Sequence, residues 1–206
     1  MELVPAVLAS GWASGVNAYL CVVVLGVLGR FGGIEAVPEA LTRTDVLVVA
    51  AVLYLLEFVT DKIPYVDSLW DAVSTAIRPT AGAVIGLLLA GDATSLEQAV
   101  LAASGGAAAL VSHLVKGGLR LIVNTSPEPV TNIGVSLGED VAVAGVATLV
   151  VVAPVVAFGI AAVLLVIGVI LLVVLWRNVR RGYRRYRAWR ERRTAGGYPK
   201  NTSASA

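Results

Sequence analysis

The chain has 206 residues, of which 57% are hydrophobic and only 15% are charged. Its mean hydropathy of +0.83 excludes an ordinary soluble globular protein and indicates an integral membrane protein. The single cysteine, Cys21, excludes an intramolecular disulfide. The net charge of +2 conceals a division, because nine arginines follow Trp176 whereas the preceding body is acidic.

Long apolar runs predict the transmembrane helices, each of which needs about 20 residues. In chain order, four runs predict four spans, and the third run is lengthened at its start by residues 74–76. The first run is as long as a full span and has no basic segment before it, so it is expected to stay in the protein rather than to be a cleaved signal peptide. The four runs are Pro5–Gly29, Asp45–Val59, Ile77–Ala90 and Leu96–Val123.

Residues 141–175 carry no charge and exceed the length of one span. Pro154 and Gly159 lie near their middle, so we expect a tight hairpin and two short spans, with one strongly tilted helix as the alternative. The total is then about six transmembrane helices. Six crossings put both termini on one side, and the arginine-rich segment makes that side the cytoplasm of a cell bounded by the plasma membrane.

An offset of about 90 residues brings short segments of the two halves into the same order. Residues 14–20 resemble 104–110, and residues 38–42 resemble 127–131. Because three spans separate the copies, the pattern predicts a 3+3 inverted-topology repeat, with low-complexity coincidence as the alternative. The expected domains are a first repeat (1–95), a second repeat (96–176) and a basic cytoplasmic tail (177–206).

Charged residues gather between the second and third spans, in FVTDKIPYVDSLWD. Glu57 and Asp61 are four residues apart, as are Asp67 and Asp71, so each pair shares a face if the backbone is helical. Pro64 separates the pairs and disfavours a continuous helix. The sequence therefore predicts two short amphipathic pieces joined at Pro64.

A second polar group lies in and after the fourth span. His113, Lys116 and Arg120 fall on one helical face, beside a Gly117–Gly118 pair that favours a kink. Asn17 is a third polar point inside the first span. Ionisable groups inside spans are costly, so they are functional candidates, although capping and headgroup anchoring are the alternative. The candidate site residues are Asn17, Glu57, Asp61, Lys62, Asp67, Asp71, Arg78, His113, Lys116, Arg120, Asn124, Ser126, Glu128, Asn132, Glu139 and Asp140.

One motif resembles a known family. The pattern E-x3-D-K-I-P-x2-D-x2-W-D-x6-R-P-x-A-G runs from Glu57 to Gly82, and N-x-S-P-E-P follows from Asn124. It is similar to the uncharacterised bacterial and archaeal membrane family known as domain of unknown function 4126. The resemblance covers roughly residues 4–162 and leaves the arginine-rich tail outside. It implies a membrane protein and supplies no activity.

The leading functional hypothesis is a transporter or channel-like protein for a cation or a proton-coupled small solute, because the two polar groups contain an excess of carboxylates. An alternative is a metal-dependent enzyme acting on a lipid headgroup, with Lys62 or Arg78 on the phosphate. A non-catalytic scaffold is the third. No cofactor is expected, and a metal is left open. The expected partners are the bilayer and anionic lipids at the arginine tail; a homo-oligomer is left open, and nucleic acid is not expected.

Overall fold

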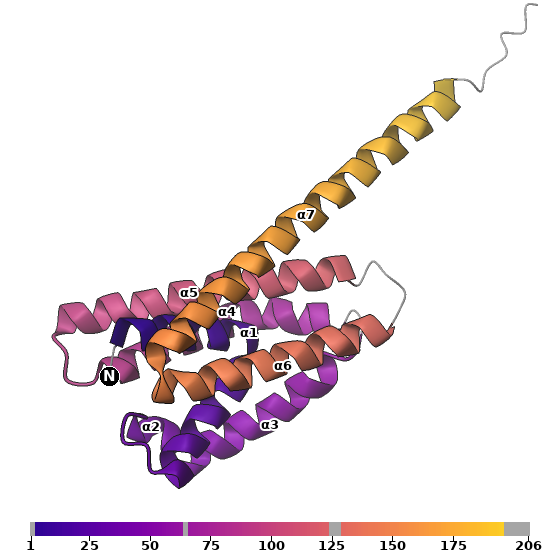
Figure 1. Cartoon of the computed structure of the whole chain (residues 1–206). Coiled ribbons are helices and arrows are strands. Elements are labelled where there is room, and N and C mark those ends of the chain that lie inside the picture. The colour runs from indigo at the N-terminus through magenta and orange to yellow at the C-terminus, as the bar shows by residue number, and fades with distance from the viewer. Residues whose placement is uncertain (1–2, 64–65, 124–128, 196–206) are drawn as a thin grey trace, which may run out of the picture.

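The computed structural model describes residues 3–63, 66–123 and 129–195, with the side chains of 122, 123, 129–132 and 185–195 left aside. No strand occurs among these residues, so the expected all-α fold is confirmed (Figure 1). The helices are α1 (Leu3–Gly32), α2 (Glu39–Thr42), α3 (Thr44–Thr60), α4 (Val66–Ala90), α5 (Ser95–Val123), α6 (Pro129–Val152) and α7 (Pro154–Ala195).

Five of the described helices, α1 and α4 to α7, are long and apolar enough to cross a membrane. Helix α3 has 17 residues, slightly fewer than a typical span. It nevertheless exposes an apolar surface, including Val48, Val52 and Leu55. Exposed aliphatic side chains of this kind suit a lipid-facing helix, because lipid tails are as apolar as leucine.

Helix α1 is broken at Asn17, whose φ of −149° and ψ of 97° are not helical. The Sγ atom of Cys21 lies 3.9 Å from the carbonyl oxygen of Ser10, whereas these residues would be about 16 Å apart along a straight helix. The two halves of α1 therefore form a hairpin. Each half has a length of only about 22 Å, less than the hydrocarbon core of about 30 Å.

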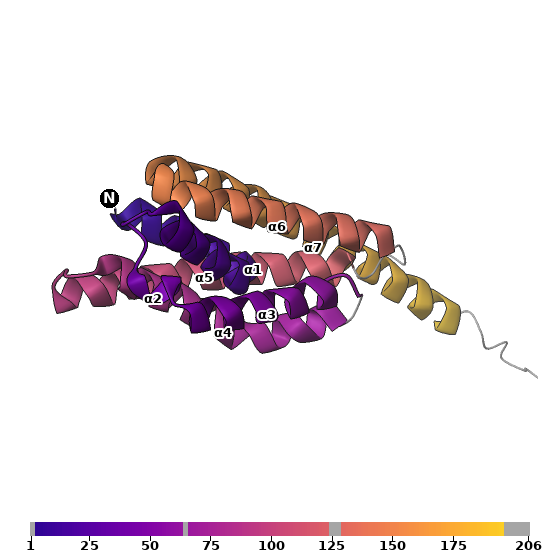
Figure 2. The same cartoon turned by 90° about the horizontal axis from the view of Figure 1, so that it is seen from below.

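The α1 hairpin starts and finishes at the same end of the bundle (Figures 1 and 2). We name this the proximal end; it also holds α2, the α4–α5 connection and the α6–α7 turn. The distal end holds the ends of α3 and α5 and the starts of α4 and α6, and α7 continues outward beyond it. Helix α1 therefore begins at the proximal end and α7 finishes beyond the distal end. The expectation that both termini lie on one side of the membrane stays a prediction.

The α1 hairpin also bears on the predicted repeat. The offset of about 90 residues pairs α1 with α5, and an inverted repeat requires these helices to run in opposite directions. The first half of α1 instead runs parallel to α5, since Gly11 meets Gly105 and Val16 meets Lys116 further along both helices. The structure therefore does not confirm a 3+3 inverted repeat.

The predicted hairpin in residues 141–175 is present. Helix α6 ends at Val152 and α7 begins at Pro154, where proline suits the first position of a helix because its missing N–H needs no partner there. Gly159 lies inside α7 and does not interrupt it. Helix α7 also continues through residue 176 without a break, so the arginine-rich tail begins as an extension of the last helix.

The helical backbone is interrupted after α3, at residues 61–63, as the proline signal predicted; Pro64 itself lies outside the described residues. The segment that follows differs from expectation. Residues from Val66 onward are not a separate short helix but the first turns of α4, which continues to Ala90 with Pro79 inside it.

Close helix contacts in the proximal half use glycine. A Cβ atom on Gly82 would lie 2.7 Å from the carbonyl oxygen of Gly105 and 2.6 Å from the Cβ of Ala109. A Cβ on Gly11 would lie 2.6 Å from the same Gly105 oxygen. Gly82 and Gly105 thus let α1, α4 and α5 approach backbone to backbone, as small residues do between membrane helices.

Candidate functional site

A cluster of buried polar side chains lies where α1 breaks and where α3, α4, α5 and α6 converge. Most of its members are less than 6% exposed, Asp140 is 9% exposed, and the side chain of Glu139 is 17% exposed. Both polar groups singled out in the sequence contribute to it. We name it the buried charge cluster; it consists of Asn17, Glu57, Asp61, Asp71, Arg78, His113, Lys116, Arg120, Glu139 and Asp140.

Arg78 connects its own helix, α4, to three others. Its Nη2 lies 2.6 Å from Glu57 Oε1 of α3 and 3.0 Å from Asp71 Oδ1, two turns earlier on α4. Its Nη1 lies 2.8 Å from His113 Nδ1 of α5 and 3.4 Å from the carbonyl oxygen of Gly15. The guanidinium is 1% exposed, so its charge is balanced by the protein rather than by water.

The contact with Arg78 fixes the tautomer of His113. A guanidinium only donates hydrogen bonds, so His113 Nδ1 must accept and carries no proton. The neutral ring then carries its proton on Nε2, which lies 3.0 Å from Thr75 Oγ1. The Thr75 hydroxyl in turn donates to the carbonyl oxygen of Asp71 at 3.0 Å. Neutral His113 thus links Arg78 to the α4 backbone.

Lys116 lies at the centre of the cluster. Its ammonium donates to the carbonyl oxygen of Val16 at 2.7 Å. It also lies 3.2 Å from Asp61 Oδ2 and 3.4 Å from both Glu57 Oε1 and Glu139 Oε2. A single charge shared among three carboxylates ties α5 to α3 and α6 at the break of α1.

Arg120 closes the cluster toward the distal end. Its Nη2 lies 2.8 Å from Asp61 Oδ2 and 2.6 Å from Glu139 Oε2. Burial raises the pKa of the Asp61 carboxyl, but Lys116 and Arg120 outweigh this effect and hold that pKa below its usual range. Asp61 is therefore an ionised member of the cluster.

The break in α1 supplies backbone groups to the same place. Because Asn17 is not helical, the carbonyl groups of Gly15 and Val16 are freed from helical bonding and accept from Arg78 and Lys116. The Asn17 side chain accepts from the Leu20 N–H at 2.9 Å, which caps the second half of α1. The negative end of the first half-helix therefore faces the buried cations.

The cluster contains more carboxylates than cations. Glu57, Asp61, Asp71, Glu139 and Asp140 face only three cations. Several buried atoms of the cluster and its surroundings also lack a hydrogen-bond partner within the described part of the chain. The three cations are Arg78, Lys116 and Arg120, and the atoms without a partner include Glu57 Oε2, Asp140 Oδ2, Ser74 Oγ, Ser136 Oγ and Arg120 Nη1.

Two cavities flank the cluster. One of about 240 Å³ lies among α1, α5, α6 and α7, with mostly apolar walls and with Lys116 and Glu139 among its lining residues. The other, of about 400 Å³, lies between α4 and α5 and reaches Asp71, Thr75 and His113. The charged groups thus separate two hollows that open on different sides of α5.

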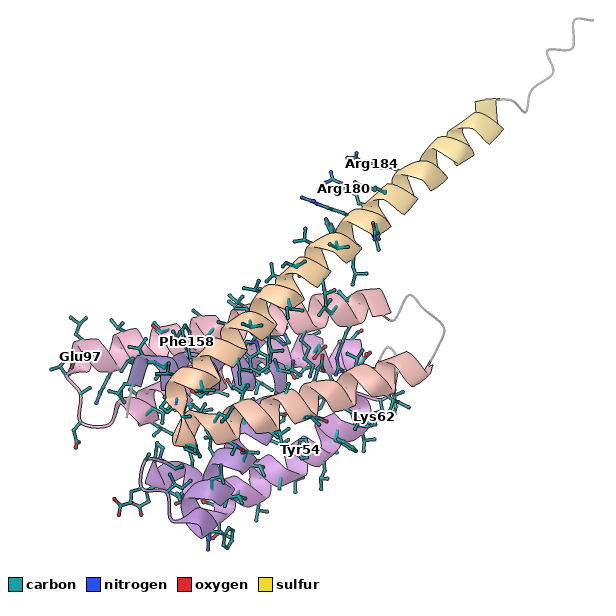
Figure 3. The ribbon with its side chains drawn as sticks, in the orientation of Figure 1. Tyr54, Lys62, Glu97, Phe158, Arg180 and Arg184 are labelled. Carbon is teal, nitrogen blue, oxygen red and sulfur yellow. The ribbon has the colours of Figure 1, made fainter. Side chains whose placement is uncertain are left out.

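Some predicted residues lie elsewhere. Lys62 points away from the cluster; its ammonium donates to the Phe58 carbonyl oxygen at 2.8 Å and lies 3.0 Å from the Phe58 ring centre, and Figure 3 shows it at the distal end of α3. Asp67 is fully buried, and its Oδ1 accepts from the N–H of Ser68. The side chains of Asn124, Ser126, Glu128 and Asn132 lie outside the described residues.

The sequence reasoning missed several polar partners. Thr75, Ser74 and Ser136 contact or adjoin the cluster, and their spacing from Asp71, Arg78 and Asp140 by three or four residues could have indicated this. The carbonyl groups of Gly15 and Val16 could not be found in this way, because the break at Asn17 is invisible in the composition of an apolar run.

Four carboxylates of the cluster, Glu57, Asp61, Asp71 and Glu139, lie beside an arginine or a lysine. Within the described residues, no three acidic, histidine or cysteine side chains are placed to share a metal ion.

The fold and the cluster define a polytopic helical membrane protein with a charged interior. The chain belongs to the family described as "Domain of unknown function (DUF4126)", whose model matches residues 4–174. The resemblance found in the motif from Glu57 to Gly82 is thereby confirmed, and the match reaches further along α7 than expected. No curated protein and no solved structure matches the chain.

Proposed function

We propose that the protein is a transporter or channel-like membrane protein that moves protons or another small cation past the buried charge cluster. The observation that carries this proposal is the meeting of a broken helix with the cluster in the interior of the bundle. Discontinuous helices whose ends point at buried charges form the ion and substrate sites of many transporters. Non-helical backbone at membrane depth is tolerated where it faces protein or a water-filled cavity.

The charge of the cluster supports a cation as the transported species. Five carboxylates against three cations leave negative charge in a medium of low dielectric constant, which attracts protons or cations and repels anions. The unpartnered buried oxygen atoms of Glu57 and Asp140 supply positions where a proton or a cation would bind. A purely structural network would be expected to satisfy these atoms.

In the proposed topology, the protein lies in the plasma membrane and its distal end faces the cytoplasm. Arg177, Arg180, Arg181 and Arg184 are exposed on α7, and Figure 3 shows Arg180 and Arg184 clear of the bundle. Arginine clusters favour the cytoplasmic side and anionic lipid. Because α1 turns back, the proposed position of the N-terminus is the opposite side, in place of the cytoplasmic position that the sequence indicated.

Flux measurements in liposomes test the proposal. Purified protein is reconstituted with a pH-sensitive dye inside the vesicles, and a potassium diffusion potential is applied with valinomycin. We expect dye-detected proton or sodium-dependent flux that falls at least tenfold in Glu57→Gln and is unchanged in Glu35→Gln, where the residue is exposed. Wild-type vesicles that leak no faster than protein-free vesicles under proton, sodium and potassium gradients would overturn the proposal.

A further inference from the structure

Asp140 of α6 differs from the other carboxylates of the buried charge cluster in what holds it. Glu57, Asp61, Asp71 and Glu139 each lie within 4.0 Å of an arginine or lysine nitrogen. In the described part of the chain, Asp140 makes no such ion pair. Its Oδ1 accepts one hydrogen bond from Asn17 Nδ2 at 3.1 Å, and its Oδ2 is buried without a partner.

An ionised carboxylate in this position is costly. Asp140 is only 9% exposed, and one hydrogen bond from a neutral amide replaces little of the hydration that the charge loses. A proton removes that cost by neutralising the group, and a single open oxygen atom is enough to receive it. We propose that Asp140 binds the proton that drives or constitutes transport. This inference deepens the proposed function and rests on it for its role in transport.

The hydrogen bond to Asn17 connects this proton to the backbone of α1. Asn17 uses one side-chain atom to cap the second half of α1 and the other to hold Asp140. A hydrogen bond to an ionised acceptor is roughly twice as strong as one to a neutral group. Protonation of Asp140 therefore weakens its hydrogen bond to Asn17. Because Asn17 lies at the hinge of the α1 hairpin, this hinge is the part of the fold that the proton loosens.

Ser136 provides a second polar atom for the protonated form. It lies four residues before Asp140, so both side chains share a face of α6. Its hydroxyl is 1% exposed and has no partner among the described residues. A neutral carboxyl gains an O–H donor that requires an acceptor, and the Ser136 hydroxyl offers one, directly or through water.

The neighbouring charges that act on Asp140 come from three directions. Lys116 of α5, and Lys62 and Asp61 after α3, are the charged side chains that act on Asp140. The Tyr54 side chain of α3 lies close enough to Asp140 to interact with it electrostatically. Lys116 is already shared among Glu57, Asp61 and Glu139, and within the described residues it forms no ion pair with Asp140.

Infrared difference spectroscopy tests the proton site without transport. Protein in lipid nanodiscs is titrated with acid and the band of protonated carboxyl groups is recorded. We expect a component that is lost in Asp140→Asn, retained in the exposed control Asp92→Asn, and shifted in its pH midpoint in Asn17→Ala. An unchanged band in Asp140→Asn would overturn the inference, as would a component that follows sodium concentration at fixed pH. If Asp140→Asn does not fold, Asp140→Glu is expected to keep the component at a shifted position.

Flux in liposomes separates this inference from the proposed function. Unimpaired flux in folded Asp140→Asn would overturn the role of Asp140 while leaving transport in place. An Asp140-dependent infrared component in a protein that carries no flux would overturn the proposed function and confine Asp140 to a proton-binding site. Loss of both the component and the flux in Asp140→Asn, with both kept in Asp92→Asn, is the expected result.

Discussion

Helices α4 and α5 pack backbone against backbone in the proximal half of the bundle and charge against charge in the distal half. Gly82 and Gly105 meet with no side chain between them. Arg78, about one turn before Gly82 on α4, and His113, about two turns after Gly105 on α5, meet through side chains. In a bilayer, apolar surfaces gain little from leaving lipid for protein, so close contact and polar bonds hold helices together. One pair of helices therefore uses close backbone contact over one half of its length and polar side-chain contact over the other.

We expect the largest effect on stability from a substitution in the charged, distal half of the bundle. Arg78→Met removes a buried cation that faces Glu57, Asp71 and His113, and leaves two carboxylates without their closest partner. We expect the free energy of unfolding in detergent or nanodiscs to fall by about 3–5 kcal/mol. Arg43→Met, which breaks an exposed ion pair with Asp45, serves as the control and is expected to change little. Equal effects of the two variants would show that the cluster carries no special stability.

The variant Gly82→Val tests the backbone contacts of the proximal half. The new side chain would collide with Ala109 and with the carbonyl oxygen of Gly105, so α4 and α5 must separate. We expect a loss of about 1–3 kcal/mol in the free energy of unfolding. Gly145→Val is the matched control, since a Cβ there meets nothing within 4 Å. A Gly82→Val protein as stable as the control would contradict backbone contact between α4 and α5.

Coupling within the charged half is tested by Asp61→Asn, Lys116→Ala and the double variant. The two side chains lie 3.2 Å apart and share further partners. We expect the two changes to be non-additive in the free energy of unfolding by about 0.5–3 kcal/mol. The same cycle on flux should also be non-additive. Full additivity in both measurements would mean that the cluster is a set of independent pairs.

The dependence of stability on pH in the acid range tests the charged half further. Because Lys116 and Arg120 hold the pKa of Asp61 below its usual range, the stabilisation is fully present above the unfolded pKa of about 3.9 and is lost as pH falls through the lower folded pKa. Thermal unfolding scans from about pH 5 down to about pH 2 should show a steep loss in wild-type protein below the unfolded pKa of about 3.9. Asp61→Asn should flatten that loss, and an unchanged slope would contradict the assignment.

The smallest effect is expected outside both halves. Arg180→Gln with Arg184→Gln changes exposed side chains of α7, so the free energy of unfolding should stay within about 0.5 kcal/mol of wild type. The enrichment of spin-labelled anionic lipid around the protein should fall, because each arginine near such a surface contributes about 1 kcal/mol. A large loss of stability would show that this part of α7 packs against the bundle.

The sequence by itself determined the class of protein, most of the helices and the identity of the charged residues. Apolar runs mark the helices because each must fill the hydrocarbon core, and Pro154 marks the α6–α7 turn because its ring cannot continue α6. The spacing of His113, Lys116 and Arg120 placed them on one face because helix geometry is local. The motif from Glu57 to Gly82 was enough to indicate the family.

Tertiary structure decided how those elements are arranged. The break at Asn17 depends on partners far along the chain: Asp140 holds its side chain, and Arg78 and Lys116 bind the carbonyl groups that the break frees. An apolar run of sufficient length looks the same whether it continues straight or turns back, so the hairpin of α1 and the relation between the halves could not be predicted. The physical reason is that a helix in lipid can release backbone bonds only where other helices bring replacements.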